Sequence, residues 1–201
     1  MTDTGRNARH KARMERKKEV IDKSIEKADQ EKGLLLVLTG NGKGKSSSAF
    51  GMMARSLGYG MKVGVAQFIK GRSDTGEEAF FAQQANVEWH VLGEGFTWNT
   101  QDRERDTATA VAGWEVTKVM LQNPDIALVI LDELTYPIKY GYLDEVAILA
   151  DIAARPPQQH VVVTGRGASQ AFIDLADTVS ELKDVKHAYR AGIKAQAGID
   201  L

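Results

Sequence analysis

The strongest constraint on this 201-residue chain is an apolar run that leads directly into a glycine-rich loop. Residues 34–38 are continuously apolar, which is typical of a strand covered by helices on both faces. The loop that follows reads TGNGKGKS, and residues 46–57 then have the pattern of a helix that ends at glycine. A strand, a glycine loop and a helix in this order predict a P-loop, in which backbone N–H groups surround a phosphate.

This loop is one residue shorter than the common form, which has four residues between its two glycines. Counting back from Gly44, the first glycine should stand at position 39, where the chain has Thr39, and Gly40 leaves only three residues between. Lysine can neutralise phosphate charge, and a serine hydroxyl can bind Mg²⁺. The candidate nucleotide-binding residues are Gly40, Asn41, Gly42, Lys43, Gly44, Lys45, Ser46 and Ser47. The alternative is a glycine-rich turn without a ligand.

Beyond this loop, apolar runs alternate with helical patterns. Strands are expected at residues 34–38, 63–68, 87–91, 126–131 and 160–164. Helices are expected at residues 46–57, 77–84, 102–122, 144–154 and 168–176, with residues 179–182 closing the sheet. Such alternation implies right-handed crossovers and an α/β fold. We therefore expect a mainly parallel central sheet flanked by helices, of the P-loop NTPase (RecA-like) type, over residues 33–201, after an N-terminal helical arm at residues 1–32.

Two further places at the carboxyl ends of strands carry charged side chains. Asp132 and Glu133 follow a strongly apolar strand, where P-loop proteins hold a second contact to Mg²⁺. The two side chains point to opposite faces if the strand continues that far, so one of them is expected to approach the metal directly. Arg166, in TGRG, follows another strand and either reaches a bound phosphate or lies on the surface. These residues and the loop together predict a Mg-nucleotide site.

The segment GEGFTW at residues 93–98 places Phe96 and Trp98 in a glycine-bounded loop outside any periodic face. Aromatic side chains in such a loop either line a pocket for a flat ligand or anchor the loop to the core. The four histidines are scattered and do not have the spacing of metal ligands.

The N-terminal arm differs in composition from the rest of the chain. Its first eighteen positions include seven basic residues, Arg6, Arg9, Lys11, Arg13, Arg16, Lys17 and Lys18. Such a run either binds an anion or is a solvated helix face, and the sequence leaves both open. Met14, Ile21, Ile25 and Ala28 recur at helical spacing, which predicts an apolar stripe that is buried on this chain or on a partner.

The composition excludes several classes of protein. The chain has no cysteine, so disulfides and thiolate-bound zinc or iron–sulfur sites are excluded. A net charge of −1 gives no reason to expect a nucleic acid as the main partner. The longest apolar runs are too short to span a bilayer, so no membrane association is expected. These features agree with a cytoplasmic location.

Seven segments, in this order, resemble the P-loop type of ATP:corrinoid adenosyltransferase of the cobalamin pathway. They are TGNGKGKS (39–46), VAQFIKG (65–71), GFTW (95–98), LDELTY (131–136), TGRG (164–167), DLADTVSEL (174–182) and GIKAQAGID (192–200). The shortened loop together with GFTW is far more specific than a P-loop alone. Serines stand at positions 46 and 47 where the family usually has threonines, and either hydroxyl can bind Mg²⁺.

The resemblance implies transfer of the 5′-deoxyadenosyl group from ATP to the cobalt(I) of a corrinoid, with release of triphosphate. It implies ATP held in the reverse of the usual P-loop orientation, with the γ-phosphate near the usual α-phosphate position. The leaving group would be neutralised by Lys43, Lys45, Arg166 and Mg²⁺ on Ser46 and the Asp132–Glu133 pair. Phe96 and Trp98 would displace the lower axial ligand of cobalt, so that Co(II) becomes easier to reduce.

The resemblance also implies partners. The chain would form a homodimer in which the N-terminal helix folds over the partner's corrinoid pocket, and this would bury the apolar stripe. An electron-donor protein or reduced flavin would supply the reduced corrinoid. The residues alone leave two alternatives open, a P-loop ATPase or kinase, and an ATP-dependent RNA-binding module that uses the basic arm.

Overall fold

The computed structural model describes residues 3–69, 75–93 and 102–200. The chain divides into two compact units, residues 1–32 and residues 33–201. The first unit contains a single helix, α1 (Asp3–Glu26). The side chains of Met14, Ile21 and Ile25 on this helix are largely exposed. Ion pairs four residues apart, such as Lys18 with Asp22 at 2.6 Å, support the helix from its polar side.

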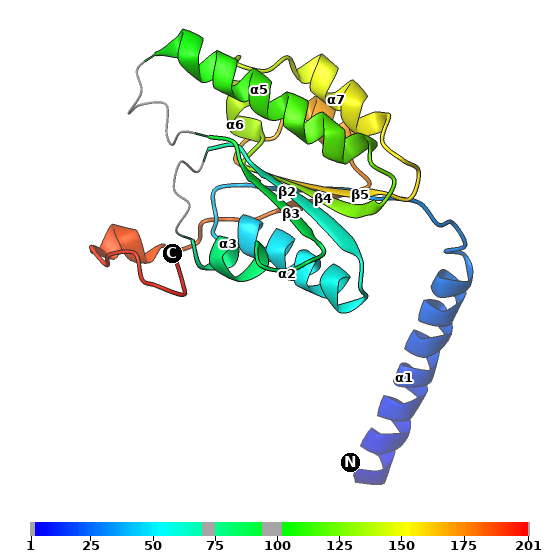
Figure 1. Cartoon of the computed structure of the whole chain (residues 1–201). Helices are drawn as coiled ribbons and strands as arrows, with labels where there is room; N and C mark the ends of the chain where they lie inside the picture. Colours follow the sequence, from blue (N-terminus) through cyan, green and yellow to red (C-terminus); the bar gives the residue numbers. More distant parts are fainter. Residues whose placement is uncertain (1–2, 70–74, 94–101, 201) are drawn as a thin grey trace. The chain divides into compact units, whose positions relative to one another are not determined.

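The second unit is built around a parallel sheet (Figure 1). Its six described strands are β1 (Leu35–Thr39), β2 (Lys62–Gln67), β3 (Val87–Val91), β4 (Ile126–Asp132), β5 (His160–Thr164) and β6 (Thr178–Glu181). They lie in the order β3-β2-β4-β5-β1-β6, and every neighbouring pair is parallel. The carboxyl ends of all these strands therefore meet at one edge, where α/β proteins bind their ligands.

Helices cover both faces of the sheet (Figure 1). One face carries α2 (Lys45–Gly58) and α3 (Gly76–Phe81). The other carries α5 (Arg103–Gln122), α6 (Thr135–Lys139), α7 (Glu145–Ala153) and α8 (Gln170–Leu175). After β6 the chain continues into a short 3₁₀ helix, η1 (Ala188–Ala191). This arrangement confirms the predicted α/β fold with a mainly parallel sheet.

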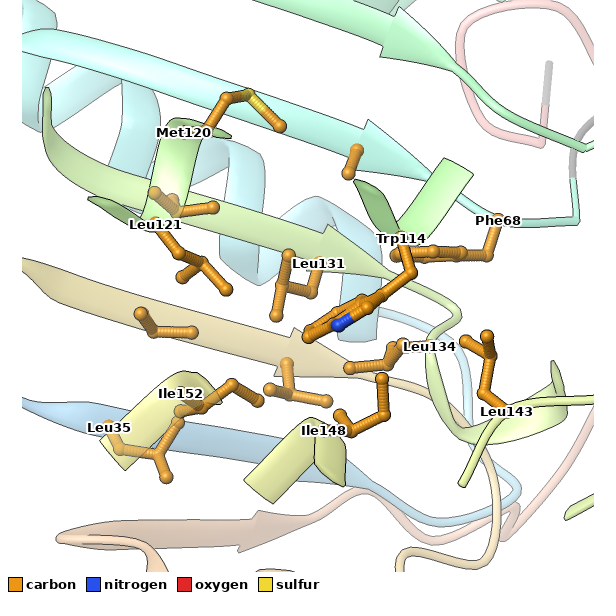
Figure 2. Close-up of a cluster of buried hydrophobic side chains, with 14 of the residues drawn as sticks. Leu35, Phe68, Trp114, Met120, Leu121, Leu131, Leu134, Leu143, Ile148 and Ile152 are labelled. Carbon is orange, nitrogen blue, oxygen red and sulfur yellow. The ribbon is translucent and has the colours of Figure 1, made fainter. Parts of the chain in front are cut away.

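The larger core lies under α5 and α7 (Figure 2). Trp114 of α5 packs there with Phe68, at 6.2 Å between ring centroids, and its Nε1 donates to Asp151 Oδ2 of α7 at 2.8 Å. A second cluster lies under α2, where Phe50 stacks on Trp89 at 5.4 Å. Apolar side chains on both faces explain why the central strands read as continuous apolar runs rather than alternating ones.

The predicted elements are found close to their expected bounds. The strands at residues 87–91 and 160–164 begin and end where they were expected. Helix α3 ends at Phe81, three residues earlier than expected, because residues 82–86 turn into β3. Helix α6 was not predicted, since five residues that include Pro137 are too few to show a helical period.

The buried amide of Gln159 joins α5, β4 and the turn between them. Its Nε2 lies 3.1 Å from Met120 O, 3.1 Å from Asn123 O and 3.0 Å from Ile126 O. These carbonyl groups end α5 and begin β4, so without Gln159 they would lose a buried donor. The Gln159 amide therefore fixes how α5 leads into the central strand.

We expect Gln159→Leu to lower the free energy of unfolding by about 2 kcal/mol, because the carbonyl groups of Met120, Asn123 and Ile126 lose a buried donor. The change is measured by urea denaturation followed by circular dichroism. Gln122→Leu, at the exposed last residue of α5, serves as the control and should change stability by less than about 0.5 kcal/mol. Equal stability of the two variants would contradict the role given to Gln159.

Candidate functional site

The glycine-rich loop joins β1 to α2 at the carboxyl edge of the sheet. Gly44 is the N-cap of α2 and has φ of 108°, a left-handed conformation that glycine adopts at little cost. The first intrahelical bond runs from Ser48 N to Gly44 O at 2.8 Å. The N–H groups of the preceding helical residues, Lys45 to Ser47, are therefore available to an anion, and the helix dipole favours negative charge at this end.

Gly40 and Gly42 of the loop pack against Leu182 and Lys183, the residues that follow β6. Gly42 N donates to Leu182 O at 2.7 Å, and a Cβ atom at position 42 would lie 2.7 Å from Lys183 O. At Gly40 a Cβ atom would lie only 2.4 Å from Leu182 O. Glycine is thus required here for close approach of two backbones, a reason that the motif alone did not reveal.

A cavity of about 690 Å³ opens beside this loop. It is lined by residues of the loop and α2, of α3, of the β4 and β5 ends, and of the C-terminal segment. The lining residues are Gly42, Lys43, Gly44, Lys45, Ser46, Ser47, Gly76, Glu77, Phe80, Phe81, Glu133, Tyr136, Arg166, Gly198, Ile199 and Asp200. The loop and TGRG, far apart in the sequence, therefore meet at one cavity.

Asp132, the last residue of β4, is fully buried behind the loop. Its Oδ1 accepts from Ser46 Oγ at 2.7 Å and from Thr164 Oγ1 at 2.8 Å. Its Oδ2 accepts from Gln67 Nε2 at 3.1 Å. A buried carboxylate requires such donors, because leaving it without hydrogen bonds would cost several kcal/mol. Asp132 thereby ties the start of α2 to β2, β4 and β5.

Glu133 leaves the strand direction at once, which explains why it lines the cavity. It has φ of 61°, the one positive φ among the described residues other than glycine. The backbone N–H of Glu133 donates to Thr164 Oγ1 at 2.9 Å, which holds this conformation. The strand therefore does not continue through Glu133, and both carboxylates of the acidic pair stay close to the loop.

Lys45 and Arg166 give the cavity its positive charge. Lys45 Nζ donates to Gly42 O at 2.7 Å, and burial together with the nearby Arg166 lowers the pKa of Lys45, while Glu133 opposes that shift. Arg166 follows β5, and Thr135 Oγ1 donates to its carbonyl oxygen at 3.1 Å. The chain after β5 is thereby tied to α6 beside the cavity.

Some residues at this edge were missed by sequence reasoning. Tyr136 and Phe80 line the cavity, and burial raises the pKa of Tyr136. Gln67 and Thr164 hold Asp132 from behind. Both end buried strands in segments that were quoted for the resemblance, and a buried polar residue at a strand's carboxyl end is the signal that could have found them.

Not every predicted residue lines the cavity. Asn41 is exposed and, like Gly40 and Asp132, is absent from the lining. Phe96 and Trp98 lie outside the described residues. Within the described part of the chain, no three His, Cys, Asp or Glu residues group together in a way that could hold a metal ion. A search of the same residues found no helix that is both long and apolar enough to cross a membrane.

The chain is similar to known proteins over nearly its whole length. Residues 31–201 match the family described as ATP:corrinoid adenosyltransferase BtuR/CobO/CobP, and residues 1–25 match the cob(I)alamin adenosyltransferase N-terminal family. The chain is 61% identical over 196 residues to a corrinoid adenosyltransferase of Pseudomonas aeruginosa, covering 97% of each chain. It is 48% identical over 192 residues to corrinoid adenosyltransferase CobA of Salmonella typhimurium, covering 96% of this chain and 97% of that one.

We expect Glu133→Gly to be more stable than Glu133→Ala by about 1 kcal/mol, because only glycine accepts the left-handed backbone at position 133 without strain. Both variants lack the carboxylate, so the comparison isolates the backbone. The free energy of unfolding is measured for both by urea denaturation. If Glu133→Ala were as stable as Glu133→Gly, the positive φ at this position would be wrong.

Proposed function

Because the chain belongs to the ATP:corrinoid adenosyltransferase family, we propose that the cavity beside the loop holds the triphosphate of ATP during adenosyl transfer. The family acts in cobalamin biosynthesis and takes ATP and a corrinoid as substrates. The observation that carries the proposal is the convergence of Lys43, Lys45 and Arg166 on one cavity at the open end of α2. Cations and free N–H groups together suit a polyanionic leaving group.

The proposed chemistry is a displacement at the ribose C5′ carbon. The electron pair of cobalt(I) forms the cobalt–carbon bond, the C5′–O bond breaks, and its electron pair leaves with triphosphate. Cobalt(I) is already a strong nucleophile, so the protein need not remove a proton from it. Its task is to orient C5′ and to stabilise the charge on the departing oxygen.

Mg²⁺ belongs to the proposal because the residues present suit it. Ser46 Oγ and the carboxylates of Asp132 and Glu133 are oxygen donors, which Mg²⁺ prefers. Mg²⁺ is usually held by one or two carboxylates together with substrate phosphates, and this agrees with the lack of a three-residue metal cluster in the described part of the chain. When bound, the ion would neutralise phosphate charge. Ser46 is oriented for this by its 2.7 Å bond to Asp132.

The orientation of ATP is proposed from the resemblance of the shortened loop. The γ-phosphate would lie near the position that an α-phosphate takes in an ordinary P-loop, which leaves the adenosyl end free to meet the corrinoid. Phe96 and Trp98 would displace the lower axial ligand of cobalt. In the sequence these two residues stand between β3, which ends at Val91 at the same sheet edge as the loop, and α5, which begins at Arg103.

The N-terminal arm supports a proposed homodimer. Residues 1–25 match a family of N-terminal segments, and the apolar side chains of α1 are largely exposed. We propose that α1 covers the corrinoid pocket of a partner copy. An electron-donor protein or reduced flavin would supply the reduced corrinoid, and the lack of cysteine suits a cytoplasmic site for this pathway.

The proposal is tested with ATP, Mg²⁺ and chemically reduced cobalamin, with adenosylcobalamin and triphosphate measured as products. We expect Lys45→Ala to weaken ATP binding by about 100-fold or more, since a charged hydrogen-bond donor to phosphate is lost. Lys62→Ala is the control, because Lys62 starts β2 at the opposite edge of the sheet. Release of orthophosphate without an adenosyl product would overturn the proposed reaction, and unchanged ATP affinity in Lys45→Ala would overturn the role of Lys45.

We expect Phe96→Ala combined with Trp98→Ala to impair the reaction from cob(II)alamin more than the reaction from cob(I)alamin. The reason is that displacement of the axial ligand matters only while cobalt is still to be reduced. Initial rates of adenosylcobalamin formation are measured from both starting states, with the exposed Tyr59→Ala as control. Equal losses from both states would contradict an axial-ligand role.

A further inference from the structure

The C-terminal segment, residues 183–200, contributes a carboxylate to the cavity that holds phosphate in the proposed function. Gly198, Ile199 and Asp200 line the cavity, together with Lys43, Lys45 and Arg166. The same segment encloses a second cavity of about 280 Å³, and Gly42, Lys43, Ile199 and Asp200 line both. Asp200 therefore lies at the boundary between the two cavities, directly on the loop.

The Asp200 carboxylate forms an ion pair with Lys43, through Oδ1 and Nζ. Its Oδ2 accepts from Gln196 N at 3.1 Å, and Asp200 N donates to Gln196 O at 2.8 Å. These two bonds form a turn that keeps the carboxylate aimed at the loop. The Lys43 and Gln196 hydrogen bonds lower the pKa of Asp200, since both favour the charged carboxylate.

The two loop lysines differ in their partners. Lys45 donates to Gly42 O of its own loop, whereas Lys43 pairs with a residue 157 positions away. The Lys43 side chain is 52% exposed and that of Asp200 is 22% exposed, so the pair is accessible to a competing anion. An ion pair that is this exposed contributes little free energy, so an anionic ligand can replace Asp200 at Lys43.

We propose that Asp200 is an intramolecular competitor of triphosphate, pairing with Lys43 while the phosphate cavity is empty and giving way when a polyphosphate binds. The inference rests on the proposed function, since it takes the cavity to be the triphosphate site. A triphosphate carries more negative charge than one carboxylate, so it displaces Asp200 from Lys43 when it binds. After adenosyl transfer, the return of Asp200 to Lys43 offsets part of the attraction that retains the product. Asp200 thereby speeds the release of triphosphate.

The first test measures the binding of inorganic triphosphate to the full chain by calorimetry. We expect Asp200→Asn to lower the Kd by about threefold, the size of effect that a partly exposed ion pair exerts. Asp200→Glu, which keeps the charge, should bind nearly as the unaltered chain does. Asp184→Asn is the control, because Asp184 also follows β6 but forms its ion pair with Arg190, at 2.5 Å. An unchanged or higher Kd in Asp200→Asn would overturn the proposal, as would an equal fall in Asp184→Asn.

A double-mutant cycle with Lys43→Gln separates competition for Lys43 from a general effect of charge. In the Lys43→Gln background, Asp200→Asn should leave the Kd for triphosphate unchanged, because the contested cation is gone. A threefold fall in that background would show that Asp200 acts on the cavity as a whole, and the proposal would be wrong.

Hydrogen exchange gives a readout that a purely structural role would not move. Triphosphate should increase the exchange of backbone amides in residues 192–200, because these residues lose the ion pair that holds them to the loop. Slower exchange would mean that the segment closes over the phosphate, which overturns the proposal. These readouts use only inorganic triphosphate. If the chain formed no adenosylcobalamin but gave the expected binding and exchange results, the proposed reaction would be wrong and the role of Asp200 would stand. If it formed adenosylcobalamin but did not give those results, the role of Asp200 would be wrong and the reaction would stand.

Discussion

The buried carboxylate of Asp132 is the interaction on which the rest of the site depends. It accepts hydrogen bonds from Ser46 at the start of α2, from Gln67 at the end of β2 and from Thr164 at the end of β5. A charge removed from water in this way is tolerated only because every donor is aimed at it. The same bonds hold the loop, the central strand and its two neighbours in one register. The loop can therefore present N–H groups to an anion without rearranging.

The sheet order explains why the charged residues meet. β5 lies between β1, which carries the loop, and β4, which carries the acidic pair, so Arg166 at the end of β5 comes next to both. The left-handed conformation of Glu133 keeps its carboxylate at the same edge. Residues from five separate stretches of chain thus form one cavity in which cations face carboxylates. In the proposed function, the cations and the N–H groups at the start of α2 would stabilise the leaving triphosphate, and cobalt(I) would need no general base.

Much of this could be predicted from the sequence, for identifiable reasons. The apolar runs at residues 126–131 and 160–164 predicted strands, because burial on both faces removes the alternation of apolar and polar residues. The glycines and lysines between an apolar run and a helical pattern predicted a strand–loop–helix unit, because this combination is typical of a phosphate-binding loop. Helix α6 and the bounds of α3 were not predicted, since short helices have no period to detect. The contact of the Leu182 carbonyl with Gly40 and Gly42 could not be predicted either, because every residue type has the same backbone carbonyl.

By itself, the sequence determined the α/β class, the position of the P-loop, the acidic pair and, through its motifs, the family. Those features depend on hydrophobic period, on glycine at defined spacings and on side-chain type, which are all local properties. Only the tertiary structure decided that Asp132 is bonded from three sides and that Asp200 pairs with Lys43. It also decided that Gly40 and Gly42 lie against the backbone that follows β6, where a side chain would not fit. These are contacts between residues 32 to 157 positions apart, and they arise from the packing of the sheet and its connections rather than from any local pattern.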